Sequence, residues 1–321
     1  MKDFPISGIE EARQFLKDRF RADPSTVEHA GEGAWSICFG FKCKGEDLVI
    51  RFGNQVDDFQ KDRFAHTFAA PRLPIPKVIE IGQAFDGYFA VSTRVKGKPL
   101  ESSTMDEWIT TVPAVVSALE DLRLADLTST TGFGIWDGNG NASYTGWFDY
   151  LLTVGEDTPG KRTHGWRENL IRHTDGEKAF RWGFDLLKSL ANTSVPRCLV
   201  HGDLLNRNVL TDGGAITGVF DCGCSSYGDH LYDLAWFEFW APWHPTLDVD
   251  KLKIALIERW RICNYKPTDM EARLKACYLH IWLDHLAYNA FTQNWSTLSE
   301  TAERMKQLMN RGIDQALLNG A

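Results

Sequence analysis

The sequence predicts an α+β fold in two lobes, a small strand-rich lobe over residues 1–97 and a larger, mostly helical lobe over residues 98–321. Three observations support this prediction. Short apolar or alternating runs separated by turn residues fill the first part of the chain. Helical spacing of apolar residues dominates the second part. The length of 321 residues is about twice the commonest domain size, so it accommodates two lobes.

In the first lobe, apolar residues at three- and four-residue steps up to Phe20 predict an initial helix. The runs Ser36–Phe41 and Leu48–Phe52 flank a turn and predict a hairpin. A helix at Asp58–Ala69 is expected to end at the prolines that follow it. Two further strands complete the small sheet, at Lys77–Ile81 and Phe89–Val95.

The second lobe opens with a helix start, because Thr104 and Glu107 have the spacing of a capping box. Pro113 predicts a kink or a second start in this helix. Residues 128–146 are rich in turn residues and are expected to form a long surface loop or insertion. Four later segments have helical spacing, namely Ala179–Leu190, Tyr232–Trp240, Lys251–Trp260 and Ala272–Ala290.

Charge and composition exclude several classes of protein. The net charge is −8, and residues 1–97 contain equal numbers of basic and acidic residues, so the acidic surplus lies in the second lobe. This lobe therefore suits a cationic partner, although acidic surfaces often serve only solubility. The sequence has no basic block, so we expect no nucleic-acid partner.

Cysteine usage and hydropathy indicate where the protein resides. The seven cysteines are odd in number and scattered, which predicts reduced thiols in a cytoplasmic protein without a structural zinc site. The N-terminal residues carry charges throughout and lack the apolar core of a signal peptide. No uncharged apolar run reaches the roughly 18 residues of a membrane span. We therefore expect a monomer with no membrane partner.

The most informative stretch is Leu199–Leu210 (LVHGDLLNRNVL), which is followed by an Asp-Gly-Gly turn and the apolar run Ile216–Phe220. The two runs flank the turn and are expected to pair as a hairpin, which brings Asn208 beside Asp221. Mg²⁺ prefers oxygen ligands and commonly uses only one or two protein groups with phosphates and water. Asp203 would face the same volume, where a carboxylate can accept or orient the proton of an alcohol.

The spacing of these residues is that of a catalytic loop. His201, Asp203 and Asn208 form H-x-D-x-x-x-x-N, and Asp221 follows thirteen residues later. In protein-kinase-like enzymes the Asp of this pattern is the base, and the Asn and the later Asp hold Mg²⁺. His201 is expected to brace the loop by hydrogen bonding. Two alternatives are an ordinary hairpin with turn and cap residues, and a zinc site of His201, Asp203 and Cys222 that lacks a fourth ligand.

The motif reads H-G-D rather than H-R-D, and Cys-Gly-Cys follows Asp221. Together with the segment Gly228–Ala235 (GDHLYDLA), it resembles the aminoglycoside phosphotransferase family. Shorter strings are similar to the hygromycin B phosphotransferases within that family, at Leu73–Gly82, Thr130–Gly134 and Leu283–Leu286.

The resemblance implies a bilobal protein-kinase-like fold that moves the γ-phosphoryl group of ATP, with Mg²⁺, to a hydroxyl of a cationic aminoglycoside. Hygromycin B is the expected acceptor and antibiotic resistance the expected role, and GTP is the alternative donor. Asp203 would be the catalytic residue, and Asn208 and Asp221 the metal ligands.

The first lobe would clamp the nucleotide. The run GEGAWS begins like a glycine-rich loop but ends in Ser, and its Gly33 and Ser36 are candidate phosphate neighbours. The resemblance makes Arg51 the strand cation that binds the phosphates, with Asp62 as its candidate partner. Otherwise Arg51 is an outward strand residue and Asp62 belongs to a solvated helix face. Backbone groups of the hinge would bind the purine, at Ser92, Thr93 and Val95.

Acceptor recognition is assigned to aromatic and acidic residues, because a polycationic amino sugar needs carboxylates for its ammonium groups and aromatic faces for its rings. The candidates are Trp236, Glu238, Trp240 and Asp284. The tryptophans could instead pack in the core, and the two acids could form surface pairs. Asp229 and Asp233 are interpreted as stabilisers of a loop and a helix start.

Two other functions remain open from the sequence. The same fold could phosphorylate another small alcohol, such as choline, a macrolide or a sugar metabolite. A kinase-like scaffold could also bind a partner or a nucleotide without turnover, although all three polar groups of the proposed centre are present.

Overall fold

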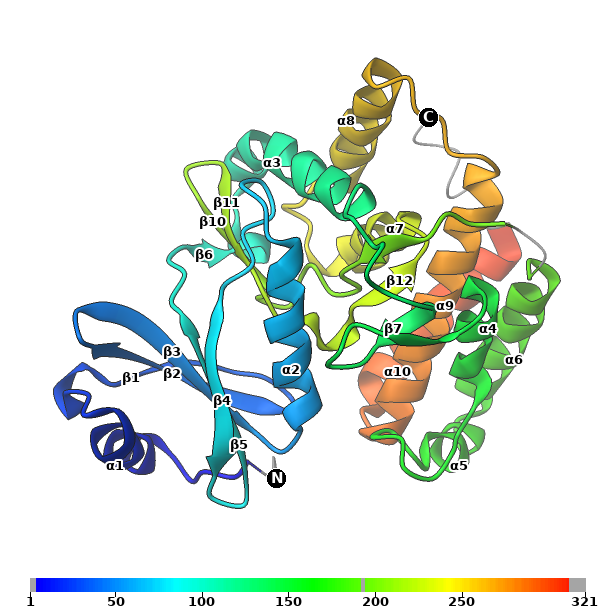
Figure 1. The fold of residues 1–321 in the computed structure, drawn as a ribbon. Coiled ribbons are helices and arrows are strands. Elements are labelled where there is room, and N and C mark those ends of the chain that lie inside the picture. The colour runs from blue at the N-terminus through cyan, green and yellow to red at the C-terminus, as the bar shows by residue number, and fades with distance from the viewer. Residues whose placement is uncertain (1–3, 192–193, 312–321) are drawn as a thin grey trace.

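The computed structural model describes residues 4–191 and 194–311, which form the two lobes shown in Figure 1. The strand-rich lobe holds a five-stranded antiparallel sheet with the order β1-β2-β3-β5-β4. Its helix α1 spans Ile9–Phe20, as expected for the start of the chain. The strands are β1 (Glu28–Glu32), β2 (Ser36–Cys43), β3 (Glu46–Gly53), β4 (Val78–Ala84) and β5 (Gly87–Thr93).

The hairpin expected at the centre of this sheet is confirmed, because β2 pairs with β3 and Phe39 lies opposite Ile50. Alternate side chains of the two strands are buried in a phenylalanine-rich core that also contains Leu16 of α1. Burial of one phenylalanine or leucine side chain contributes about 1.5–3 kcal/mol to folding stability, because its apolar surface is removed from water. Aromatic packing and helix α1 therefore fix the sheet that carries Arg51.

Helix α2 (Val56–Ala65) stands between this sheet and the rest of the molecule in Figure 1. The sequence predicted a helix that continued to Ala69, but a short 3₁₀ turn at His66–Phe68 replaces its last turn. Ala65, at the end of α2, is buried in the core of the helical lobe rather than in that of the sheet. Helix α2 thus contacts both lobes, and the expected boundary at residue 97 stays a prediction.

The helical lobe contains the four helices expected from their spacing. Pro113 lies inside the first long helix, α3, and not at its start. The helices are α3 (Met105–Arg123), α4 (Trp147–Leu151), α5 (Trp166–Ile171), α6 (Thr174–Ser189), α7 (Leu231–Trp240), α8 (Val249–Ile262), α9 (Met270–Phe291) and α10 (Trp295–Arg311).

Two small sheets support the segments between these helices. One has the order β11-β10-β6 and the other the order β8-β7-β12-β9. Their strands are β6 (Lys98–Pro99), β7 (Phe133–Trp136), β8 (Ala142–Tyr144), β9 (Cys198–Val200), β10 (Val209–Asp212), β11 (Ala215–Val219) and β12 (Ser226–Gly228).

Residues 128–146 were expected to form a long surface loop or insertion, and the loop was wrong, because β7 and β8 lie within this range. Trp136 of β7 is fully buried and stacks on Tyr227 of β12, with 5.9 Å between ring centroids. β7 and β8 are only four and three residues long. The Gly, Asn and Thr residues around them are typical of turns, so the sequence predicted a loop instead of strands.

Two expectations about the whole chain can be compared with the structure. All seven cysteines lie in the described part of the chain and are free thiols. Within residues 4–191 and 194–311, no helix combines the length and the apolar character needed to cross a bilayer.

The capping box of α3 gives a first testable prediction. The Thr104 hydroxyl accepts a hydrogen bond from the Glu107 N–H (3.3 Å), and the Glu107 carboxylate accepts one from the Thr104 N–H (2.8 Å). We expect Thr104→Ala to lower the free energy of unfolding by about 1 kcal/mol in urea titrations, because an orphan N–H loses its partner. Ser117→Ala in the same helix is the control, and an equal loss in both variants would contradict the capping role.

Candidate active site

The catalytic segment runs from β9 to the hairpin formed by β10 and β11. Val209 pairs with Val219, and the N–H of Phe220 donates to the carbonyl of Asn208 at 3.0 Å. The hairpin expected from the Asp-Gly-Gly turn is therefore confirmed. Its two ends carry Asn208 and Asp221, which the backbone bond places next to each other.

Asp203 lies against this hairpin end. Its Oδ2 accepts a hydrogen bond from Nδ2 of Asn208 (2.9 Å), and its Oδ1 accepts one from Nδ2 of Asn206 (2.8 Å). Burial raises the pKa of Asp203 to about 7, and the nearby charge of Asp221 acts in the same direction. Because Asn208 turns its amino group to Asp203, its amide oxygen remains for a cation.

Asn206 is a site residue that the sequence reasoning missed. It occupies the left-handed region with φ +57°, as does Arg207 with φ +70°. Asn tolerates this conformation better than most residues, which gives Asn206 a structural reason to occur here. Asn206 lies inside the H-x-D-x-x-x-x-N motif, but the motif assigns no role to its position.

Asp221 follows β11 in a left-handed conformation, with φ +64°. A non-glycine residue in this region stores strain, which the surrounding structure must hold in place. Its side chain is half exposed, and its Oδ1 lies 3.7 Å from Nη1 of Arg51. The strained backbone thus turns a carboxylate towards the cation that comes from the other lobe.

Arg51 on β3 also forms an ion pair with Asp62 of α2, and its guanidinium lies 4.8 Å from the centre of the Phe59 ring. The other oxygen of Asp62 accepts a hydrogen bond from the N–H of Cys222 (2.8 Å). Burial alone would lower the pKa of Arg51, and the charges of Asp62 and Asp221 raise it, so the guanidinium stays charged. Asp62 therefore joins β3, α2 and the segment after Asp221.

His201 braces the catalytic segment, as the sequence predicted. Its Nε2 lies 3.2 Å from the carbonyl of Phe220, and its Nδ1 accepts a hydrogen bond from the N–H of Asp203 (3.2 Å). Burial lowers the pKa of His201 to about 4, so the ring is neutral and Nε2 is the donor. Gly202 has φ +78°, and a Cβ there would lie 2.8 Å from the carbonyl oxygen of Cys224, which explains H-G-D in place of H-R-D.

Asp233 of α7 stabilises the same segment, in agreement with the interpretation of Asp229 and Asp233 as stabilisers of a loop and a helix start. Its two carboxylate oxygens accept hydrogen bonds from the N–H groups of His201 (3.0 Å) and Gly202 (2.8 Å). Burial raises the pKa of Asp233 to about 6, and the two N–H donors act in the opposite direction. The carboxylate thus takes up two backbone donors that would otherwise be unpaired inside the protein.

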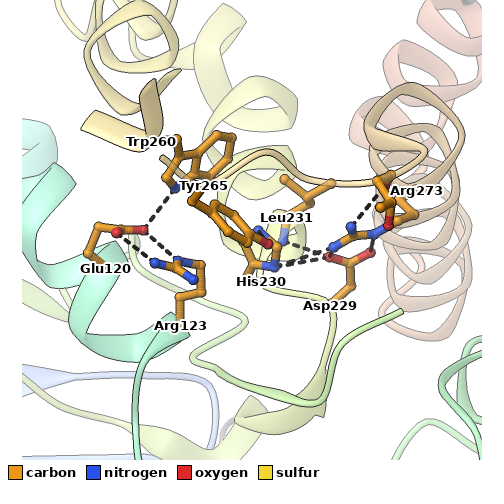
Figure 2. Close-up of polar contacts among 9 residues, drawn as sticks. Glu120, Arg123, Asp229, His230, Leu231, Trp260, Tyr265 and Arg273 are labelled. Atoms are coloured by element: carbon orange, nitrogen blue, oxygen red, sulfur yellow. Dashed lines mark hydrogen bonds and ion pairs between the residues drawn. The ribbon is translucent and has the colours of Figure 1, made fainter. Parts of the chain in front are cut away.

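Figure 2 shows how the start of α7 is held. Asp229 accepts a hydrogen bond from the N–H of Leu231 (3.0 Å) and two more from Arg273 of α9 (2.8 and 2.6 Å). Both side chains of this ion pair are only 1% exposed. Neighbouring polar contacts in the figure join Glu120 to Arg123 and Trp260, and Tyr265 to His230. Asp229 therefore fixes the helix that presents Asp233.

The other residues expected to bind the nucleotide lie in the turn between β1 and β2 and in the stretch from β5 to the crossing between the lobes. Gly33 and Ser36 close a tight turn between β1 and β2, where the N–H of Gly33 donates to the carbonyl of Ser36 (2.9 Å). Ser92 and Thr93 lie inside β5, which has a neighbouring strand on each side, so they precede the crossing between the lobes. Val95 lies in the crossing itself, and the assignment of these three residues to the purine stays a prediction.

The acceptor candidates separate into two groups. Asp284 of α9 is exposed. Desolvation by the atoms around its carboxyl group raises the pKa of Asp284 to about 6. The charge of Asp284 raises the pKa of the Cys224 thiol, as do the charges of Asp203 and Asp221. Trp240 is half-buried and packs on His285, with 5.3 Å between ring centroids, and Trp236 packs on Trp240 at 6.0 Å. Because its charge reaches Cys224, Asp284 lies near the catalytic segment.

Glu238 forms an ion pair with Lys253 at 3.1 Å, and both side chains are largely buried. Burial raises the pKa of Glu238, and Lys253 opposes this shift. The carboxylate already has a cationic partner between α7 and α8, an arrangement that the sequence did not predict. Its role in acceptor binding stays a prediction.

The ligand chemistry of the segment suits Mg²⁺. Among residues 4–191 and 194–311, no group of three or more His, Cys, Asp or Glu side chains is arranged to hold a metal by itself. The zinc alternative with His201, Asp203 and Cys222 therefore lacks support in the part of the chain that is described. One amide oxygen and one carboxylate, from Asn208 and Asp221, match an ion that takes its other ligands from phosphates and water.

The buried pair of Asp229 and Arg273 gives a second prediction. We expect Arg273→Met to lower the free energy of unfolding by about 3–5 kcal/mol, because Asp229 then stays buried without its partner. The control is Arg261→Met, which removes an exposed pair with Glu258 and should leave stability unchanged. Urea denaturation measures both variants, and equal stability of the two would show that the buried pair does not hold α7.

Known proteins are similar to this chain in sequence and in fold. The model of the phosphotransferase enzyme family matches residues 53–264. The chain is 27% identical over 303 residues to hygromycin-B 4-O-kinase from Escherichia coli, covering 93% of this chain and 84% of the relative.

Solved structures show the same relationship. A thermostable mutant of aminoglycoside phosphotransferase APH(4)-Ia with AMP-PNP and hygromycin B is 28% identical, with a TM-score of 0.81 and coverage of 94% of this chain and 99% of that chain. A second mutant, with ADP and hygromycin B, is 27% identical, with a TM-score of 0.82 and the same coverage. The expected protein-kinase-like fold is confirmed. Since the family model covers more than half of the chain, the protein belongs to the phosphotransferase enzyme family.

Proposed function

We propose that the protein transfers the γ-phosphoryl group of ATP, in the presence of Mg²⁺, to a hydroxyl group of hygromycin B. The observation that carries this proposal is the meeting of Asp203, Asn208 and Asp221 at one hairpin end, where Asp221 lies 3.7 Å from the Arg51 guanidinium. The names of the relatives support the same acceptor, since they include a hygromycin-B 4-O-kinase and a structure with AMP-PNP and hygromycin B.

Each residue has a separate task in this proposal. Asn208 and Asp221 would hold the metal ion, which neutralises phosphate charge when it is bound. Arg51 would bind the phosphates, and Asp62 holds its guanidinium in place. Asp203 would orient the acceptor hydroxyl and accept its proton, since two amide groups fix its carboxylate. Most of the rate gain would come from positioning and charge neutralisation.

The nucleotide base would lie at the crossing between the lobes. The backbone of Ser92 and Thr93 pairs within the sheet, so we assign the hydrogen bonds to the purine to the stretch from Val95 onwards. Gly97 in this stretch has φ +147°, and a Cβ there would lie 2.9 Å from the carbonyl oxygen of Thr211. The crossing is therefore held close to β10, which begins directly after Asn208.

The acceptor would approach from the side of Asp284. Its exposed carboxylate offers a partner for an ammonium group, and the half-buried rings of Trp236 and Trp240 offer apolar faces for the sugar rings. Glu238 is less available, because Lys253 pairs with it. We therefore assign the main electrostatic contact with the acceptor to Asp284.

The division of labour predicts different defects for two variants. Asp203→Asn should lower kcat about 10²- to 10⁴-fold and leave ATP affinity unchanged, because only the proton acceptor is lost. Asp221→Asn should lose both transfer and Mg²⁺-dependent ATP binding. Coupled ADP release, nucleotide titration and the mass of the recovered drug, with one added phosphate, measure these effects. Asp212→Asn, on an exposed residue of the same hairpin, is the control.

Asp284 predicts a pH dependence. With its pKa raised to about 6, the carboxylate is charged above pH 6 and becomes neutral as the pH falls through 6. We expect kcat/KM for hygromycin B to fall in that range, and Asp284→Asn to lower kcat/KM at pH 7.5 and to weaken the dependence around pH 6. Asp185→Asn on an exposed face of α6 is the control. A profile of Asp284→Asn identical to that of the wild type would remove Asp284 from the acceptor site.

A further inference from the structure

We propose that Arg162 is a positioning residue that holds the nucleotide-binding parts of the strand-rich lobe against the helical lobe. Arg162 lies in the segment 156–165, which joins the turn after α4 to α5 in the helical lobe. The proposal rests on the proposed nucleotide role of Arg51 and of the turn between β1 and β2. It assigns a function to a residue that no motif of the sequence marks.

The guanidinium of Arg162 contacts two elements of the strand-rich lobe. Its Nη2 donates a hydrogen bond to Oδ1 of Asp58 in α2 at 2.8 Å. The same group lies over the indole ring of Trp35, 5.4 Å from the ring centroid. Because Trp35 stands between Gly33 and Ser36, a single side chain of the helical lobe contacts both α2 and the turn expected at the phosphates.

The segment that carries Arg162 is anchored in its own lobe. Oδ1 of Asp157 accepts the N–H of Gly165 (2.8 Å) and lies 2.9 Å from Nδ1 of His164, and its Oδ2 accepts the N–H of Arg167 (2.9 Å). Nζ of Lys161 donates to the carbonyl of Thr153 at 3.3 Å. A side chain on such an anchored segment can fix the position of the elements that it contacts.

Helix α2 transmits this contact to the catalytic segment. Asp62 lies one helical turn after Asp58 and binds both Arg51 and the N–H of Cys222. A displacement of α2 would therefore move the phosphate-binding cation and the residue that follows Asp221. Nearby, a Cβ on Gly223 would lie 3.8 Å from Oδ1 of Asp58 and 3.6 Å from Oδ1 of Asp221, so Asp58 is close to the metal-side carboxylate.

The charge of Arg162 also suits this place. Asp58, Asp62 and Asp221 bring three carboxylates near the expected phosphates, and like charges there oppose nucleotide binding. Arg51 pairs with two of these carboxylates, and Arg162 pairs with the third. Arg162 therefore both holds α2 and neutralises the acid that Arg51 does not contact directly.

The test compares Arg162→Ala, Arg162→Lys and Arg167→Ala in the full chain. Arg162→Ala should raise KM for ATP about three- to tenfold while kcat changes less than about twofold, because a partly exposed ion pair and a cation–π contact are lost. Arg162→Lys should fall between, since Lys keeps the charge but not the planar stacking. Arg167, in the first turn of α5, contacts Trp166 and the Gly155 carbonyl within the helical lobe, so Arg167→Ala is the matched control and should keep the wild-type KM.

A double-mutant cycle with Asp58→Asn separates a direct contact from a general disturbance. The double variant Asp58→Asn with Arg162→Ala should bind ATP no more weakly than Arg162→Ala alone, because both changes remove the same pair. Additive losses, an unchanged KM in Arg162→Ala, or a loss confined to kcat would each overturn the proposal.

Two further measurements keep the outcome clear. Thermal unfolding should give the same Tm for Arg162→Ala and Arg167→Ala. If Arg162→Ala has a lower Tm, the KM of Arg162→Lys for ATP decides the test in its place. Titration with AMP-PNP and Mg²⁺ gives the dissociation constant directly, without any acceptor. The proposal is thus tested even if hygromycin B is not the substrate, and an equal dissociation constant for wild type and Arg162→Ala would overturn it.

Discussion

The site depends on the backbone hydrogen bond that closes the hairpin of β10 and β11. The N–H of Phe220 binds the carbonyl of Asn208, and this bond places an amide and a carboxylate side by side although they stand thirteen positions apart in the sequence. Asp203 then joins through Nδ2 of Asn208. The turn is a short connection, so little chain entropy is lost in bringing these groups together. The strain at Asp221 is the local cost of this arrangement.

The buried acids around the catalytic segment act as supports rather than as reacting groups. Asp233 takes up two backbone N–H groups of the segment, and Asp229 holds the start of the same helix through Arg273. A buried carboxylate costs several kcal/mol in lost hydration, which paired donors offset. The benefit is geometric, because a segment with consecutive left-handed residues needs fixed partners to keep a single conformation.

Much of this could be predicted from the sequence, because the informative signals are local. The turn between the two apolar runs predicts the hairpin, and the fixed offsets of Asp203, Asn208 and Asp221 predict their meeting. Short strands were missed at β7 and β8, where packing of Trp136 on Tyr227 overrides a turn-rich composition. Asn206 and Arg162 were also missed, because their partners are set by tertiary structure. The contact of Arg162 with Asp58 spans 104 residues, and no spacing rule reaches that far.

We propose that Asn208 and Asp221 bind the same divalent ion. Titration of Mn²⁺ in the presence of ADP, followed by the electron paramagnetic resonance of free Mn²⁺, tests it directly in the wild type, Asn208→Ala and Asp221→Ala. We expect one tight Mn²⁺ site in the wild type and an affinity at least about tenfold weaker in each variant, because a ligand has been removed. Unchanged Mn²⁺ affinity in both variants would show that these two residues do not share the ion.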